Sequence, residues 1–325
     1  MKKLFFGFVV SLLSIWAISK NFDLKVFQGL SSRIQWWVLI FIILHIALGA
    51  FFFAVRWWYL IGKKMSLWKC FEATVLGLFG NCTLPARGGD VLRLIHGKKE
   101  AHLSYVGLTS KLFLEKVIDF TWVIFMGGVA FFLIGANGDS DSSYLLFLIS
   151  GLIVGGMLIS LLVLKIYPDL LIKILLIPFK LIKKEQFFHG HIENPIRELK
   201  EFLKIENLSM PLLITFPTWI LGYGFTYYWQ GIMIGVPVNP VEVAFVMFAA
   251  GMGGALPAAP SGVGVIHAAI ITAFVIIGRP SSEGLIYGTW VHLSNLIIMV
   301  VLGLPFYLKW IFSKKPTDLD TLEEE

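Results

Sequence analysis

The chain has 325 residues, of which 57% are hydrophobic and only 15% are charged, and its formal net charge is +6. Soluble domains contain about 45–50% apolar and about 25% charged residues, so this composition excludes an ordinary soluble enzyme or binding domain. The positive charge does not indicate nucleic-acid binding, because the basic residues cluster in loops between long apolar runs.

Six apolar runs approach or reach the length of about 17–25 residues that a helix needs to cross a bilayer. They are Leu4–Ile18, Trp36–Val55, Val117–Ile134, Tyr144–Leu164, Leu212–Ile234 and Leu285–Ile311. The first run is short and follows two lysines, as in a signal peptide, but we interpret it as an uncleaved signal anchor. The sequence therefore predicts an all-α polytopic membrane protein with about six full spans.

Two further apolar segments are interrupted by proline and glycine. The first consists of Leu67–Leu84, the break Pro85–Gly89 and Asp90–His96, and the second of Val241–Leu256, the break Pro257–Gly264 and Val265–Ile277. Proline removes a backbone donor and glycine frees the backbone, so both sites should break a helix. Lipid tolerates a broken backbone only where protein or a water-filled cavity covers it. We predict two re-entrant or broken helical hairpins; ordinary hairpins with turns at the membrane surface are the alternative.

The distribution of basic residues predicts the orientation of the chain. Arg87–Lys116 holds six Lys or Arg and Lys165–Met210 holds eight, whereas the loop Gly135–Ser143 holds none. We therefore expect a cell (plasma or inner) membrane protein with both termini, Arg56–Lys69, Arg87–Lys116, the basic segment 165–210 and the tail 313–325 in the cytoplasm. Within the basic segment, Leu170–Ile182 suggests a helix lying on the cytoplasmic leaflet; a solvated connecting hairpin is the alternative. With this orientation the first broken segment enters from the cytoplasm and the second from outside. Leu-Pro-Ala recurs at both breaks, and this pairing indicates an inverted repeat.

Charged residues follow the first break at helical spacing. Arg87, Asp90 and Arg93 are three residues apart and share one face of a helix that begins after Gly88 and Gly89. A helix N-terminus with an adjacent arginine attracts phosphate, so the pattern predicts an anion site. The alternative is that both arginines are ordinary cytoplasmic charges and that the aspartate pairs with one of them.

A second group of charges continues into an apolar span. Lys111, Glu115 and Asp119 are four residues apart, and Asp119 is flanked by apolar residues on both sides. A charge at mid-bilayer costs at least ~2.5–3.5 kcal/mol, so such residues are usually paired or functional. We predict that Asp119 faces a cavity; a simple interfacial pair between Lys111 and Glu115 is the alternative.

The remaining polar residues indicate no catalytic or metal site. His267, His292 and Asn295 lie inside apolar segments and are expected to form hydrogen bonds between helices. Cys70 and Cys82 show no metal-ligand spacing and are expected to be free thiols. The sequence contains no nucleotide-binding glycine pattern, nucleophile elbow or zinc motif.

In the two broken segments and in the charged start of the span after the first of them, the chain resembles the lysylphosphatidylglycerol synthase transmembrane-region family of flippase-like membrane proteins. The segments that carry the resemblance are Gly80–Arg93, Leu114–Asp119 and Leu256–Ala269. The family pattern has a proline-x-arginine-x-glycine-acid element with a later arginine, then glutamate-arginine with a following aspartate. A proline- and glycine-rich loop ending in glycine-x-x-glutamate or histidine completes it. Here Lys116 replaces the usual arginine, Ser261 replaces a common glycine, and His267 takes the last position.

The resemblance implies one flippase-like transmembrane domain over residues 1–325. It also implies a lipid transporter or flippase that moves an anionic or phosphate-headgroup lipid, such as a phospholipid, between leaflets. Large family members carry a fused cytoplasmic aminoacyltransferase domain, for which this sequence shows no segment, so we expect no catalytic residues, cofactor or metal. Membrane lipids are the expected partners, and nucleic acid is not.

The residues expected to bind the lipid come from the three motifs. They are Asn81, Pro85, Arg87, Gly88, Gly89, Asp90, Arg93, Glu115, Asp119, Pro260, Gly262, Gly264 and His267. Two other functions remain as alternatives. One is a non-catalytic membrane partner of a separate lipid-modifying enzyme or glycosyltransferase. The other is a membrane-embedded lipid-phosphate transferase with Asp90 or Asp119 as its base.

The charge asymmetry predicts which loops are reachable from outside the cell. In a variant lacking Cys70 and Cys82, a cysteine at Lys184 should resist a membrane-impermeant maleimide in intact cells, because residues 165–210 face the cytoplasm. A cysteine at Ser140, in the loop without basic residues, should react with the same reagent. External labelling at Lys184 would contradict the predicted orientation.

Overall fold

The structure is a computed structural model, and it describes residues 34–84, 88–135, 205–255 and 262–312 and parts of 151–197. Every regular element within these ranges is a helix. Four stretches there are long and apolar enough to cross a membrane: Trp36–Leu60, Tyr105–Ile134, Leu208–Met233 and Ser281–Phe312. The predicted all-helical membrane protein is confirmed to this extent. The predicted span Leu4–Ile18 and most of Tyr144–Leu164 lie outside the described residues.

The first described span corrects the sequence prediction. The short helix η1 (Trp36–Val38) leads into α3 (Leu39–Leu60), which continues past the expected end at Val55. Aromatic and aliphatic residues follow Val55, so the apolar character of the helix does not end there. Arg56 therefore lies inside the helix and is fully buried, although the sequence prediction placed it in a cytoplasmic loop.

The second described span begins earlier than its apolar run. Helix α6 (Tyr105–Gly135) starts twelve residues before the predicted start at Val117. Ser104 precedes it, and the Ser104 hydroxyl accepts a hydrogen bond from the Gly107 N–H at 3.0 Å, as an N-cap residue does. Lys111 and Glu115 are therefore part of the same helix as Asp119.

The first broken segment forms two helical arms that pack closely. They are α4 (Leu67–Thr83) and α5 (Gly88–Ala101), and residues 85–87 between them lie outside the described residues. Glycines line the contact: a Cβ added at Gly80 would lie 2.5 Å from the Gly89 Cα. Gly89 has no room for a side chain, because its Cβ would overlap the Gly77 carbonyl oxygen. We predicted from the sequence that glycine breaks the helix here. The close approach of the two arms is a second reason for glycine at this position.

The second broken segment has the same form. Its arms are α13 (Pro240–Ala255) and α14 (Val265–Ile276), with residues 256–261 outside the described residues. Gly262 and Gly264 precede α14 with φ of +69° and +87°. Glycine adopts these angles without the steric cost that a side chain would add, so glycine suits both positions.

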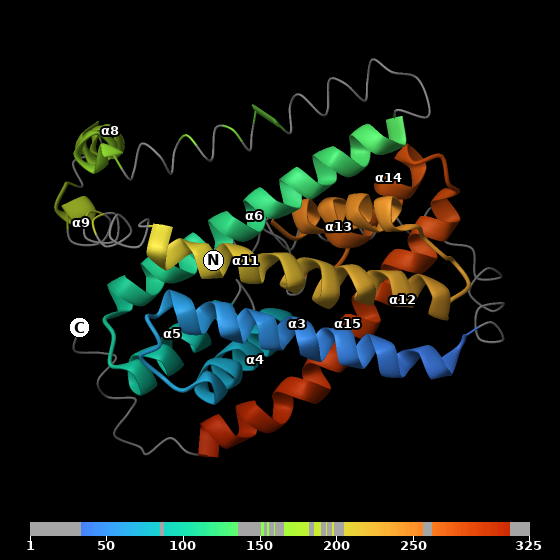
Figure 1. Cartoon of the computed structure of the whole chain (residues 1–325), viewed down its shortest axis with the longest axis horizontal. Coiled ribbons are helices and arrows are strands. Elements are labelled where there is room, and N and C mark those ends of the chain that lie inside the picture. The colour runs from blue at the N-terminus through green and yellow to red at the C-terminus, as the bar shows by residue number, and fades with distance from the viewer. Residues whose placement is uncertain are drawn as a thin grey trace.

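Helix α15 (Ser281–Phe312) connects the two hairpins. This helix contacts α4 of the first hairpin and α14 of the second, while α6 packs against α13. Helix α3 runs beside a continuous rod formed by α11 (Ile205–Pro217), the π-helix η4 (Thr218–Gly224) and α12 (Phe225–Met233) (Figure 1). Gly49 of α3 and Gly222 of η4 allow this approach, because a Cβ at Gly222 would lie 2.6 Å from the Gly49 Cα.

The predicted helix within the basic segment is also present. Helix α8 (Pro168–Leu181) agrees closely with the expected Leu170–Ile182, and a short helix α9 (Glu185–Phe188) follows it. Ile172 and Phe188 from these helices are buried in an apolar cluster with residues of α3, α4 and α6. Further apolar clusters lie among α12–α15 and between η1, α3, α12 and α15.

Candidate functional site

Two of the predicted site residues, Arg93 and Glu115, form a buried bidentate ion pair between α5 and α6. The Arg93 Nη1 and Nη2 atoms donate to Glu115 Oε1 and Oε2 at 2.6 and 2.9 Å. The Arg93 guanidinium also lies over the indole of Trp57, 4.1 Å from the ring centroid. The parallel fork fits a carboxylate, and the aromatic face gives the cation a further favourable contact.

Asp119, another predicted site residue on α6, pairs with an arginine from a different helix. Arg56 of α3 donates through Nη1 and Nη2 to Asp119 Oδ1 and Oδ2 at 2.7 and 2.8 Å. Arg56 Nη1 also donates to the Thr215 hydroxyl of α11 at 3.0 Å. The Trp219 indole N–H of η4 donates to Asp119 Oδ1 at 2.9 Å. Asp119 therefore joins α6 to α3 and to the π-helix.

The two pairs form one ion-pair network of Arg56, Arg93, Glu115 and Asp119, because Arg56 Nη2 lies 3.8 Å from Glu115 Oε1. The side-chain exposures are 0%, 6%, 1% and 13% in that order. Burying an ion costs several kcal/mol even in a relaxed protein, and only close pairing with further hydrogen bonds offsets that cost. Two positive and two negative charges balance, so the network is neutral overall.

Asp90 lies beside the first break in a separate set of contacts. The Asn81 side-chain amide of α4 donates to Asp90 Oδ1 at 3.2 Å, and Lys116 Nζ lies 3.4 Å from the same oxygen. The lysine that replaces the usual family arginine thus contacts the acidic residue of the first motif. Gly88 and Gly89 begin α5 at this point. Pro85 and Arg87, predicted for the same site, lie outside the described residues.

His267 lies at the second hairpin and belongs to neither group. Its Nδ1 atom lies 3.4 Å from the Gly264 N–H nitrogen and 3.4 Å from Nδ1 of His292 on α15. Asn295 accepts a hydrogen bond from the Gln230 side chain of α12 at 2.9 Å. The prediction that these polar residues link helices is confirmed. Gly262 and Gly264 flank the second break, whereas Pro260 lies outside the described residues.

The sequence prediction missed Arg56 and its neighbours Thr215 and Trp219. Arg56 was assigned to a loop because it ends a run of strongly apolar residues. The signal that identifies it is the sequence after it: Trp57 to Ile61 are also apolar, so the sequence indicates a charge inside a longer span, near its end. Thr215 and Trp219 carried no comparable signal, because both residue types are common in membrane helices.

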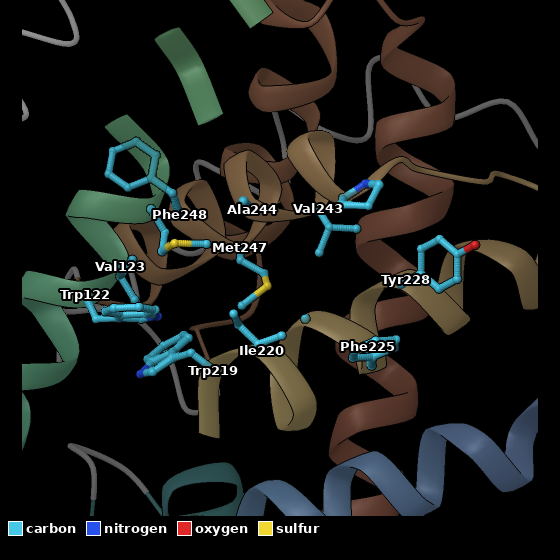
Figure 2. Close-up of a pocket in the computed structure, with 13 residues that line it drawn as sticks. Trp122, Val123, Trp219, Ile220, Phe225, Tyr228, Val243, Ala244, Met247 and Phe248 are labelled. Atoms are coloured by element: carbon cyan, nitrogen blue, oxygen red, sulfur yellow. The ribbon is translucent and has the colours of Figure 1, made fainter. Parts of the chain in front are cut away.

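An apolar pocket of about 390 Å³ lies next to the network (Figure 2). It is formed by residues of α6, η4, α12 and α13, with Pro240 at the start of α13. The residues that line it are Trp122, Val123, Met126, Trp219, Ile220, Gly224, Phe225, Tyr228, Pro240, Val243, Ala244, Met247 and Phe248. Trp219 belongs to both sites, since its ring lines the pocket and its N–H binds Asp119.

Within the described ranges, no group of three or more His, Cys, Asp or Glu side chains is placed to hold a metal ion. Cys70 and Cys82, the two cysteines of the sequence, are not joined by a disulfide.

Apolar helices long enough to span a bilayer, with charges paired inside them, define a multi-pass helical membrane protein. Residues 4–303 match the family described as lysylphosphatidylglycerol synthase TM region, and the chain belongs to that family. The family is linked to lipid modification and flipping in membranes. No curated protein and no solved structure matches the chain. The family resemblance predicted from the three motifs is confirmed.

The ion-pair network predicts a strong effect of removing a single charge. Asp119→Asn should destabilise the protein by about 3–5 kcal/mol, because it removes the bidentate counterion of a buried arginine and leaves two arginines with one carboxylate. The double variant Arg56→Met, Asp119→Leu should recover part of that loss, since it removes both charges. Thermal unfolding in detergent measures both effects.

Glu283→Gln is the matched control, because Glu283 pairs with Arg279 while 36% exposed, and exposed pairs contribute at most about 1 kcal/mol. If Asp119→Asn unfolds at the same temperature as this control, the buried pairing does not stabilise the fold.

Proposed function

We propose that this protein moves an anionic or phosphate-headgroup lipid between the leaflets of the cell membrane, with both termini in the cytoplasm. The observation that carries the proposal is the buried ion-pair network, which joins the second arm of the first hairpin to two membrane spans. Ionisable residues inside a membrane are costly and mark substrate or ion pathways. Family membership supports lipid as the cargo.

The headgroup would bind at the first break, at the start of α5. The first turn of a helix leaves backbone N–H groups unpaired and carries a partial positive charge. Both terminal nitrogens of Arg93 are held by Glu115, so Arg93 would contribute by supporting α5 and not by binding the anion itself. Arg87, immediately before α5, would supply the direct phosphate contact. Glu115 and Asp119 would hold the arginines of the network in position.

Arg87→Ala should therefore abolish or strongly reduce lipid binding and movement while the protein still folds. Loss of one charge-assisted hydrogen bond of about 1.5–3 kcal/mol corresponds to a roughly 10- to 100-fold loss of affinity. Arg87→Lys should restore activity only in part, because lysine lacks the planar fork. Movement of fluorescent phosphatidylglycerol and of a fluorescent polyprenyl phosphate in proteoliposomes is the measurement.

Arg197→Ala is the matched control, because Arg197 is exposed and its partners Asp169 and Glu193 lie in the basic segment. Normal lipid movement by Arg87→Ala protein would refute the anion site. A wild-type protein that moves neither lipid faster than empty liposomes would count against the transport function itself.

The two hairpins would form an inverted pair whose breaks meet near the bilayer midplane. Their common form, two arms joined through a proline- and glycine-rich break, supports this arrangement, and so does α15, which contacts an arm of each. An inverted pair would direct two helix N-termini at one point, and exchanging the conformations of its halves would turn an inward-facing cavity outward. Alternating access of a lipid headgroup would then have a structural basis.

Cross-linking tests this arrangement. A cysteine at Gly89 is unsuitable because that position has no room for a side chain. In a background lacking Cys70 and Cys82, cysteines at Leu84 and Val263, one beside each break, should instead be joined by a short bifunctional maleimide. A cysteine pair at Leu84 and Phe312, the far end of α15, is the control. Equal yields from both pairs, or none from the first, would refute a central meeting point.

A further inference from the structure

The apolar pocket lies at the middle of two spans. Trp122 and Met126 come from the central part of the span Tyr105–Ile134, and Trp219 and Ile220 from that of Leu208–Met233. Residues at this depth are surrounded by the hydrocarbon of the bilayer. Phe225 lines the pocket and is also 38% exposed, so the pocket reaches the outer surface of the protein. The medium that has access to it is lipid.

The lining suits a flexible hydrocarbon chain. Every lining residue is apolar or aromatic. The volume of the pocket, about 390 Å³, is within the range of about 300–1,000 Å³ that is usual for small-molecule sites. Met126 and Met247 contribute unbranched side chains that adapt to occupants of irregular shape. No charge lines the pocket, so a headgroup would gain nothing by entering it.

The tryptophan end of the pocket connects it to polar chemistry. Trp122 and Trp219 lie at one end of the pocket and Tyr228 toward the other (Figure 2). The Trp219 N–H donates to Asp119, while the Trp122 N–H is buried and has no hydrogen-bond partner in the part of the chain that the structure describes.

We propose that this pocket binds one hydrocarbon chain of the lipid that the protein handles, drawing that chain out of the bilayer while the headgroup binds elsewhere. The inference rests on the proposed lipid movement and adds to it a site for the tail. Trp219 forms part of the pocket wall and also holds Asp119, so an occupant that shifts its ring also acts on the Arg56–Asp119 pair. The π-helix around Trp219 is the kind of irregular helical turn often found at functional sites.

Photo-labelling in nanodiscs tests the proposal. The probe is phosphatidylglycerol with a diazirine midway along one acyl chain, and the readout is the amount of adduct on Met126, which lines the pocket. Adducts on Phe125, which is 50% exposed on the same helix, report contact with bulk lipid. We expect abundant adducts on Met126 in the wild-type protein.

Met247→Trp fills the pocket and should lower the ratio of Met126 to Phe125 adducts several-fold. Met252→Trp is the matched control, because Met252 is 39% exposed on the same helix α13 and does not line the pocket. It should leave the ratio unchanged. Ala244→Phe fills the pocket from another position and provides a second test if Met247→Trp fails to fold.

The proposal is overturned if the ratio is the same in all variants. It is also overturned if Met126 carries no adduct in the wild type, as when another segment of the chain fills the pocket. Labelling measures occupancy and not transport, so it separates the two proposals. Adducts on Met126 without lipid movement would refute the transport function alone, whereas lipid movement without these adducts would refute the pocket alone.

Discussion

The pairing of two arginines with two carboxylates inside the membrane is the constraint on which the rest of the structure depends. An unpaired charge at this depth costs several kcal/mol, so Arg56, Arg93, Glu115 and Asp119 must find one another. Their bidentate geometry fixes the relative positions of α3, α5 and α6, and Thr215 and Trp219 extend the contacts to α11 and η4. Helices that apolar packing alone would leave free to slide are thereby held in register.

Close backbone contacts complement these polar ones. Gly80 and Gly89 bring the arms of the first hairpin together, and Gly49 and Gly222 do the same for α3 and η4. Lipid tails are as apolar as leucine, so helix association in a bilayer depends on such close packing and on hydrogen bonds more than on the hydrophobic effect. The short polar links and the small residues therefore provide attraction that burial of leucine provides in a soluble protein.

The sequence predicted the helical membrane fold, the two broken hairpins and the family, because long apolar runs and proline-glycine breaks are local signals. It also predicted that Asp119, placed inside an apolar run, faces a cavity, because a charge there needs either a partner or a function. In the structure the Asp119 carboxylate has a partner and does not line the apolar pocket. The sequence did not predict which residue that partner is. Arg56 is 63 residues away along the chain and Trp219 is 100 residues away, so their meeting depends on how separate helices pack. The apolar pocket was unpredictable for the same reason, since its wall is drawn from four helices.

The balance of charge in the network has an electrical consequence. The membrane potential does work on each elementary charge that crosses it, about 2.3 kcal/mol per 100 mV. A group of two arginines and two carboxylates that moves as one unit carries no net charge, so the potential does no work on it. A conformational change that keeps the pairs of Arg56, Arg93, Glu115 and Asp119 intact leaves the cargo's own charge, and not these four residues, to respond to voltage.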